Sequence, residues 1–221
     1  FGLIFFDLDN FKNINDSFGH DCGDALLIKV TKRVSSCLRE TEIFARLGGD
    51  EFAIMVGDMD NPGAPSAISN RILNVLKKPF EVNGVTVSTT ASIGISLYPR
   101  DGKNAENLMK NADIAMYRAK KYGRNQFCYF EEEMHRQVMK RVQIEKELKN
   151  ALDSDELYLM YQPIIDFKEK KVRSIEALVR WKFDGGTRFP DDFIPIAEES
   201  GVIVEMGRWV IKQGLKDLSL L

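Results

Sequence analysis

The chain has 221 residues, of which 44% are hydrophobic and 29% are charged, and its formal net charge is −2. It is long enough for one complete domain and part of another, and it has no basic field that would attract nucleic acid nonspecifically. No apolar run approaches the ~20 residues that span a membrane, so we expect neither nucleic-acid nor membrane contact in this segment.

The three cysteines, Cys22, Cys37 and Cys128, follow no metal or disulfide spacing, which is typical of a protein in a reducing cytoplasm. The sequence begins on Phe1 rather than on Met, which indicates a piece cut from a longer protein. We therefore expect a cytoplasmic location for this segment, within a parent protein that could be membrane-anchored upstream.

The first predicted element is a buried strand over residues 2–6, an apolar run that ends in the carboxylates of Asp7 and Asp9. From Asp24 onward, apolar residues recur at helical spacing and predict an amphipathic helix that packs on a sheet. Residues 42–56 then predict a β-hairpin with a glycine tip.

Further elements complete this first part of the chain. Pro65 is placed to begin a second helix, and Asn104 and Gly123 are placed to cap and to end a third. The other predicted strands cover residues 80–82, 85–87, 91–97 and 126–130. This order predicts an α+β fold, a sheet with helices on one face, close to a ferredoxin-like arrangement.

The composition changes after residue 130. Residues 131–154 predict a highly charged connector helix, with acids leading and lysines trailing as the helix dipole favours. A new apolar strand at residues 157–165 follows. We therefore divide the sequence into a domain at 1–130, the connector at 131–154 and a second segment at 155–221.

Four carboxylates that are far apart in the sequence are candidates for one site. Asp7 and Asp9 end the first strand, and Asp50 and Glu51 lie at the tip of the hairpin. Carboxylates without histidine suit Mg²⁺ or Mn²⁺, and glycine at a hairpin tip lets backbone amides approach a phosphate. Alternatively, the strand-end acids are solvated and the glycines only make a turn.

Five motifs in order favour the site: Phe6-Asp7-Leu8-Asp9-Asn10-Phe11-Lys12, Asn15-Asp16-Ser17-Phe18-Gly19-His20, Arg46-Leu47-Gly48-Gly49-Asp50-Glu51-Phe52, Ala91-Ser92-Ile93-Gly94-Ile95, and Ala112-Asp113 through Tyr117 with Ala119-Lys120 and Gly123-Arg124-Asn125. They resemble the GGDEF family of diguanylate cyclases over residues 2–130, without the helix that normally precedes the first strand. The resemblance implies a nucleotidyl-cyclase-like domain that condenses two GTP molecules into cyclic di-GMP. Each domain would hold one GTP, so turnover would need a homodimer, and catalysis would rest on alignment and metal charge.

The residue roles follow from the same resemblance. Asp7, the Leu8 carbonyl and Asp50 would hold Mg²⁺ or Mn²⁺. Asp50 would also help to activate the attacking hydroxyl, with Glu51 beside it in a supporting role. The phosphates would be bound by amides of the Asn10-Phe11 turn and by the side chains of Lys12, Lys120 and Arg124.

Asn15 and Asp24 match the family positions that read guanine, and a carboxylate can accept hydrogen bonds from guanine N1 and N2, two donors that adenine lacks. His20, in the same loop, is a secondary candidate, because a lone histidine more often satisfies local backbone groups. Arg39 and Glu42 lie where many family members carry an Arg-x-x-Asp product-inhibition site, here with the longer Glu. Ordinary surface charge is the alternative explanation of this pair, and it is the one we favour.

A second resemblance follows the connector. The start of an EAL-family cyclic di-GMP phosphodiesterase domain, a TIM-like barrel, is similar to three segments of this chain, residues 161–166, 176–181 and 193–201. The resemblance implies a metal ligand at Glu176 and cyclic di-GMP contacts at Gln162 and Arg180. Alternatively, Glu176 only pairs with Arg180. A complete barrel needs about 200 or more residues, so we expect an incomplete barrel segment without phosphodiesterase activity.

The preferred function is therefore a diguanylate cyclase within a bifunctional bacterial GGDEF-EAL signalling protein. Two other classes stay open: a regulatory module that binds GTP or cyclic di-GMP without turnover, and a parent protein that is chiefly a cyclic di-GMP phosphodiesterase. The complete hairpin motif together with Asp7 and Lys12 favours the cyclase, because a pure binder need not keep the metal ligands.

Overall fold

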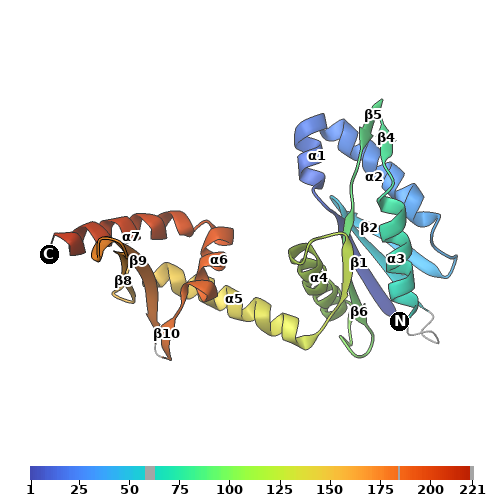
Figure 1. Cartoon of the computed structure of the whole chain (residues 1–221). Helices are drawn as coiled ribbons and strands as arrows, with labels where there is room; N and C mark the ends of the chain where they lie inside the picture. The colour runs from blue at the N-terminus through green and yellow to red at the C-terminus, as the bar shows by residue number, and fades with distance from the viewer. Residues whose placement is uncertain (58–62, 184, 220–221) are drawn as a thin grey trace. The chain divides into compact units, whose positions relative to one another are not determined.

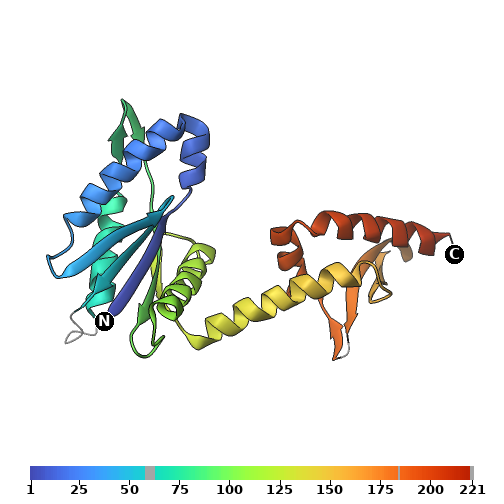
Figure 2. The same ribbon diagram turned by 180° about the vertical axis from the view of Figure 1, so that it is seen from behind.

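The computed structural model describes residues 1–57, 63–183 and 185–219, and the chain divides into two compact units, Phe1–Arg136 and Gln137–Leu221. Figures 1 and 2 show the ribbon from opposite sides. Each unit has a hydrophobic core of its own.

The first unit is built on a five-stranded sheet in the order β2-β3-β1-β6-β7. Its central strand, β1 (Gly2–Leu8), is antiparallel to β3 (Glu51–Val56) on one side and to β6 (Ala91–Leu97) on the other. The edges are β2 (Glu42–Gly48), antiparallel to β3, and β7 (Gln126–Tyr129), parallel to β6. A continuous apolar run suits the central strand because both of its faces are covered.

Within the described part of this unit, the remaining elements are α1 (Phe11–Phe18), α2 (His20–Ser35), α3 (Ala64–Leu76), α4 (Ala105–Lys121) and the hairpin of β4 (Phe80–Val82) with β5 (Val85–Val87). The predicted α+β fold is confirmed. So is the cap of α4, where Asn104 Oδ1 accepts a hydrogen bond from the Asn107 amide at 2.8 Å. The sequence does not predict α1, because this helix is mostly polar and buries only two side chains. The predicted helix from Asp24 corresponds to α2, which begins four residues earlier, at His20.

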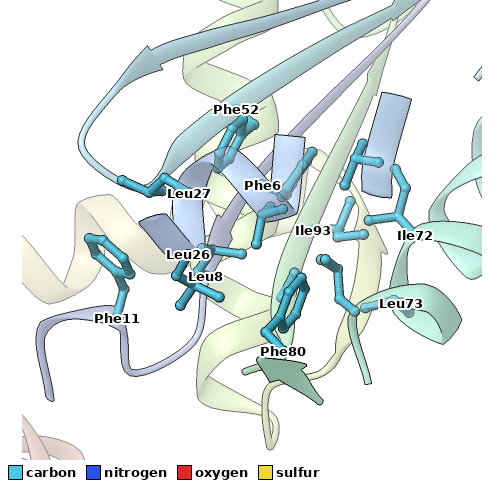
Figure 3. Close-up of a cluster of buried hydrophobic side chains, with 14 of the residues drawn as sticks. Phe6, Leu8, Phe11, Leu26, Leu27, Phe52, Ile72, Leu73, Phe80 and Ile93 are labelled. Carbon is cyan, nitrogen blue, oxygen red and sulfur yellow. The ribbon is translucent and has the colours of Figure 1, made fainter. Parts of the chain in front are cut away.

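The helices pack on both faces of this sheet. Phe6 and Leu8 of β1 point into the larger core, which α2 and α3 help to form (Figure 3), whereas Phe5 packs with Ala112 and Met116 of α4 on the other face. Both ribbon views show the sheet between α4 and the α2–α3 pair. The expected placement of the helices on one face is therefore wrong, because an apolar stripe shows that a helix packs but not on which face.

Gly94 of β6 lets α4 approach the sheet closely. A β-carbon at this position would lie 1.8 Å from the Ala112 carbonyl oxygen and 2.4 Å from the Met116 nitrogen. Backbone atoms of a helix cannot turn aside as a flexible side chain can, so a larger residue here would push α4 away from the sheet.

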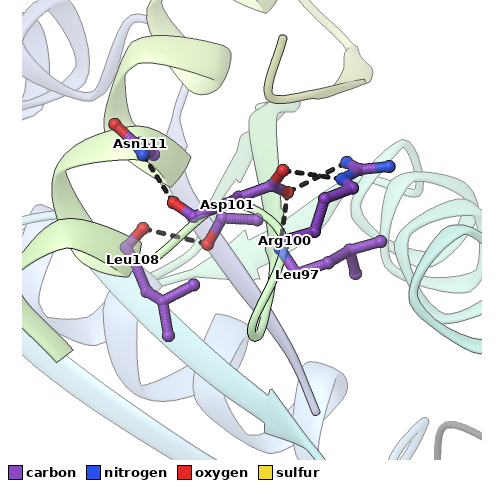
Figure 4. Close-up of polar contacts among 6 residues, drawn as sticks. Leu97, Arg100, Asp101, Leu108 and Asn111 are labelled. Carbon is purple, nitrogen blue, oxygen red and sulfur yellow. Dashed lines mark hydrogen bonds and ion pairs between the residues drawn. The ribbon is translucent and has the colours of Figure 1, made fainter. Parts of the chain in front are cut away.

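A polar cluster fixes the turn that leads into α4 (Figure 4). The buried Asp101 carboxylate accepts hydrogen bonds from the Leu97 amide at 2.7 Å and from Arg100 Nε at 2.7 Å. The Asp101 carbonyl accepts a further one from Asn111 Nδ2 at 2.6 Å. Because the start of α4 is tied to the sheet in this way, the position of its last turn, which carries Lys120, is set as well.

The second unit contains a three-stranded antiparallel sheet in the order β10-β9-β8. The elements from the connector onward are α5 (Glu132–Ala151), β8 (Leu157–Asp166), β9 (Lys171–Phe183), β10 (Gly186–Arg188), α6 (Pro190–Ser200) and α7 (Ile203–Leu218). The buried Trp181 and Phe193 rings meet edge to face, 5.6 Å apart. No helix in the described ranges has the length and apolar character needed to cross a membrane.

Candidate active site

The candidate site lies where the central strand of the first unit ends. Asp7 of β1 is only 6% exposed, and its register partners are Glu51 of β3 and Ser92 of β6. Because side chains alternate along a strand, Asp7 shares with Phe5 the face that α4 covers. Lys120, in the last turn of α4, forms an ion pair with Asp7 Oδ2. The fold thus brings a strand carboxylate and a helix cation together from distant parts of the chain.

The surroundings of Asp7 make its negative charge less favourable than it would be in water. Burial raises the pKa of this carboxyl from 3.8 to about 6; Lys120 opposes the shift, while the negative charges of Asp50 and Asp9 add to it. Its second oxygen, Oδ1, is buried and has no hydrogen-bond partner among the described residues. A bound cation would satisfy this oxygen and relieve the repulsion between the carboxylates.

Asp9 differs from Asp7 although both are buried. Its carboxylate accepts hydrogen bonds from Ser92 Oγ at 2.7 Å, from Thr90 Oγ1 at 2.5 Å and from the Asn125 amide at 3.2 Å. These neutral donors occupy the oxygens that a metal would need. Asp9 therefore clamps β6 and the turn after α4 to the end of β1, and the expected group of four carboxylates loses one member.

The hairpin between β2 and β3 brings Asp50 and Glu51 to Asp7. Gly49 at its tip has a φ of 52°, in the left-handed region that favours glycine, and its carbonyl accepts a hydrogen bond from Arg46 Nε at 2.8 Å. Asp50 is half-buried and near enough to raise the pKa of Asp7, whereas Glu51 is exposed. These acids, distant in sequence, meet as the sequence predicts.

The oxygen atoms of Asp7, Asp50 and the Leu8 carbonyl are the candidate metal ligands. Within the described ranges, no group of three or more His, Cys, Asp or Glu side chains is arranged to hold a metal ion by itself. Mg²⁺ commonly takes one or two protein carboxylates and completes its shell with water and substrate phosphates. Asp7 and Asp50, with the adjacent Leu8 carbonyl, therefore fit a metal shared with a nucleotide better than a permanent metal centre.

The candidate phosphate-binding residues lie at two turns. Asn10 immediately precedes α1 and has a φ of 60°, Phe11 is buried, and Lys12 is exposed. Arg124, also exposed, has a φ of 61° and follows α4. The Asp9 carboxylate, next to the first turn, accepts the hydrogen bond from the second turn, so the two turns are tied together.

The candidate guanine-reading residues lie on adjoining helices. Asn15 is half-buried in α1, whereas His20 and Asp24 are exposed in the first turns of α2. Asn15 Oδ1 is buried, with no hydrogen-bond partner in the described part of the chain, and it lies against Gly23. Because Gly23 precedes Asp24, the side chain of Asn15 reaches the segment that carries the second candidate.

Arg39 lies in the turn before β2, and Glu42 is the first residue of that strand. The Glu42 side chain is 7% exposed; its carboxylate accepts a hydrogen bond from the Arg39 amide at 2.8 Å and lies 4.0 Å from Arg71 Nη2 of α3. Arg39 itself is exposed. Glu42 thus stabilises the turn, and Arg71 is a nearby cation that the local sequence pattern does not indicate.

The candidate residues of the second unit are more open. Glu176 of β9 and Gln162 of β8 are register partners, and both are exposed. Arg180 donates to the Val179 carbonyl at 2.8 Å and lies over the Phe189 ring at 5.4 Å. The alternative pairing of Glu176 with Arg180 is wrong for the described residues, since four positions along a strand separate them by roughly 13 Å.

Comparisons with known proteins agree with these two parts. A family model described as "Diguanylate cyclase, GGDEF domain" matches residues 1–126, and one described as "EAL domain" matches residues 145–221. The GGDEF domain of YfiN (TpbB) from Pseudomonas aeruginosa has a TM-score of 0.57 at 38% identity, covering 59% of this chain and 81% of that one. The GGDEF domain of DgcB from Caulobacter crescentus, solved in complex with cyclic di-GMP, has a TM-score of 0.52 at 25% identity, covering 58% and 76%.

Curated relatives are similar to this chain over nearly all of its residues. Cyclic di-GMP phosphodiesterase NbdA of Pseudomonas aeruginosa is 41% identical over 99% of this chain and 28% of its own length. Bifunctional diguanylate cyclase/cyclic di-GMP phosphodiesterase MucR of the same species is 38% identical over 100% of this chain and 32% of its own length. The chain thus spans 28% to 32% of the length of these relatives.

Proposed function

The chain belongs to the GGDEF family of diguanylate cyclases and continues into part of an EAL domain, and from this premise we propose that its first unit condenses two GTP molecules into cyclic di-GMP. The observation that supports this most directly is the buried carboxylate of Asp7, which has one oxygen without a hydrogen-bond partner among the described residues and lies near enough to Asp50 for its pKa to be raised by that charge. A buried carboxylate at the end of a strand, with one oxygen still without a partner, is suited to binding a cation together with phosphates.

In this proposal Asp7, Asp50 and the Leu8 carbonyl hold Mg²⁺ or Mn²⁺, which supplies positive charge to the phosphates when it is bound. Lys12, Lys120 and Arg124, with amides of the Asn10-Phe11 turn, bind and orient the triphosphate. Lys120 already lies at Asp7, so it is positioned to meet a phosphate at the same carboxylate.

The chemical step is the attack of a 3′-hydroxyl oxygen on the α-phosphorus of the opposing GTP, with pyrophosphate as the leaving group. Asp50 accepts the hydroxyl proton, and Glu51 supports it from the next position. Two such steps close the cyclic dinucleotide. Because each domain holds one GTP, two chains must face one another, and catalysis depends on their alignment.

The test is incubation of the purified chain with GTP and Mg²⁺, followed by chromatographic separation of the products. We expect cyclic di-GMP, formed at a rate that rises faster than linearly with protein concentration because two domains must meet. ATP in place of GTP should give no cyclic product. GTP that binds but is not converted would instead identify a regulatory module that binds the nucleotide without turnover.

Guanine selectivity is proposed to depend on Asp24 and Asn15, with His20 as a secondary contact. Leaving a guanine donor without its acceptor in the complex commonly costs about 1–3 kcal/mol, so Asp24→Ala should weaken GTP binding by about 5- to 150-fold. A calorimetric titration measures this change. Unchanged affinity would show that the base is read elsewhere.

A second candidate function concerns the longer protein. NbdA is named a cyclic di-GMP phosphodiesterase, and MucR is named for both activities. These names support a parent protein that also hydrolyses cyclic di-GMP, with Gln162, Glu176 and Arg180 as part of that site. Comparing cyclic di-GMP formation and hydrolysis by the full-length protein decides which activity dominates.

Inhibition by the product at Arg39 and Glu42 is a separate hypothesis. Arg39 is exposed and Glu42 holds its turn, so the arginine is available to a phosphate or a guanine. If the hypothesis holds, Arg39→Ala relieves inhibition of the cyclase by added cyclic di-GMP. An unchanged inhibition curve would leave ordinary surface charge as the role of this pair.

A further inference from the structure

Gly23 occupies a position where neither helix propensity nor backbone conformation explains a glycine. It lies inside α2 and is buried. Glycine in a helix interior is less favourable than alanine by about 1 kcal/mol. Its φ also lies outside the left-handed region, in contrast to Gly19, which has a φ of 84° at the corner between α1 and α2.

The contact that does explain Gly23 is with Asn15. A β-carbon at position 23 would lie 1.9 Å from Asn15 Oδ1 and 3.0 Å from its Cγ. It would also lie 3.1 Å from Cζ of the buried Phe11, so the space is closed on that side as well. The Asn15 amide therefore fills the space that a side chain at position 23 would occupy.

The backbone of Asn15 is held independently of this contact. Its carbonyl accepts a hydrogen bond from the Gly19 amide at 2.8 Å, which ties it to the corner between the helices. A larger residue at position 23 would therefore leave the backbone in place and turn the Asn15 side chain aside, because a flexible amide yields more easily than a helix.

We propose that Gly23 is a specificity-determining positioning residue: it provides the space that holds the Asn15 amide beside Asp24, so that the two side chains can read one guanine. This inference rests on the proposed function, in which Asn15 and Asp24 contact the base. It adds a residue that touches no substrate and acts only through Asn15.

The test measures GTP and ATP affinities of Gly23→Ala by calorimetry, with Gly207→Ala as the matched control. Gly207 is also inside a helix, α7, but a β-carbon there would meet no atom of the described residues within 4 Å apart from its chain neighbours and its own helix backbone. We expect Gly23→Ala to weaken GTP binding on the order of 5- to 150-fold, the effect of a lost buried hydrogen bond, with ATP binding unchanged. Gly207→Ala should alter neither affinity.

A double-mutant cycle with Asn15→Ala separates positioning from a general structural effect. If Gly23 acts through Asn15, Gly23→Ala has no further effect once Asn15→Ala is present, because the double variant also removes the clash with the Asn15 amide. In nucleotide-free protein, the side-chain amide resonances of Asn15 should shift in Gly23→Ala and not in Gly207→Ala.

The outcomes that would overturn the inference are distinct from failure of the proposed function. Wild-type GTP affinity and selectivity in Gly23→Ala, or an equal loss in the Asn15→Ala background, would overturn the inference alone. Wild-type protein that binds no GTP would overturn the proposed function and this inference with it.

Discussion

Each unit carries an acidic side chain on the middle strand of a sheet, yet only one of them is enclosed. Asp7 lies on β1, where every residue except Leu3 is buried, and α4 covers its face. Glu176 lies on β9, where residues 171–177 are all exposed. Burial raises the pKa of Asp7 and leaves one oxygen without a partner. A motif residue on a strand thus becomes a site only when other elements converge on it.

The largest effect in this comparison is expected from Asp50→Ala. Formation of cyclic di-GMP should fall by about 100-fold or more, as is common when an electrostatic group at a reacting centre is removed. The fold should survive, because a half-buried acid in a turn contributes little to packing. Product chromatography measures the rate. A wild-type rate in a folded variant would remove Asp50 from the proposed mechanism.

The second-largest effect is expected from Gly94→Ala, which tests whether the close packing of α4 on the sheet is needed to bury Asp7. The new methyl group would meet the helix backbone, so we expect the first unit to lose about 1–3 kcal/mol of stability and the cyclase rate to fall as Lys120 moves. Gly57→Ala is the matched control, because among the described residues a β-carbon there meets no atom within 4 Å beyond its chain neighbours.

The probe for this experiment has to report on the correct unit. The chain has two tryptophans, Trp181 and Trp209, and both lie in the second unit. Tryptophan fluorescence therefore follows the wrong unit, and hydrogen exchange of the β1 amides measures the stability of the first. Equal exchange rates in Gly94→Ala and Gly57→Ala would show that the close approach of α4 is unimportant.

The sequence predicts the strands of the first unit and the meeting of Asp7 with the hairpin tip, because apolar periodicity and turn glycines are local signals. It does not separate Asp7 from Asp9. Both follow the same apolar run, and the difference comes from hydroxyl donors at Thr90 and Ser92, more than 80 positions away.

The two close approaches at glycine are also absent from local patterns. Gly94 and Gly23 both lie inside regular elements, where nothing in the neighbouring residues indicates which atom fills the space. Only the packed structure shows that Gly94 makes room for the backbone of α4 and that Gly23 makes room for the side-chain amide of Asn15. The face occupied by α4 was mispredicted for a related reason, since it depends on how the whole sheet is ordered.

A smaller effect is expected in the pH dependence of stability in metal-free protein. Because the pKa of Asp7 is about 6 in the folded chain and 3.8 is its ordinary value, the folded state holds this proton more tightly. Stability of the first unit should therefore decrease as pH rises from about 4 to about 6. Asp7→Asn removes the titrating group. Hydrogen exchange of the β1 amides, measured with a metal chelator present, should therefore show that the stability of Asp7→Asn relative to wild type increases across that range.

Lys120→Met tests how Lys120 contributes to this pH dependence of stability. Lys120 lowers the pKa of Asp7, so its removal should raise that pKa further and extend the decrease in stability to higher pH. An unchanged pH profile in Lys120→Met would show that the ion pair does not persist in solution. A flat profile in the wild type would show that Asp7 is better solvated than its burial indicates.

The smallest effect, none at all, is expected from Glu176→Ala in this chain. Hydrolysis of a phosphodiester needs several converging ligands to fix a metal and to lower the pKa of its water. Glu176 is exposed, and the described residues include no group of three acidic, histidine or cysteine side chains that could hold a metal. The purified chain should therefore leave cyclic di-GMP intact, with or without the substitution, when the dinucleotide is followed by chromatography. Conversion to the linear dinucleotide that is lost in Glu176→Ala would contradict this expectation, and it would require a second chain to complete the barrel and supply the other metal ligands around Glu176.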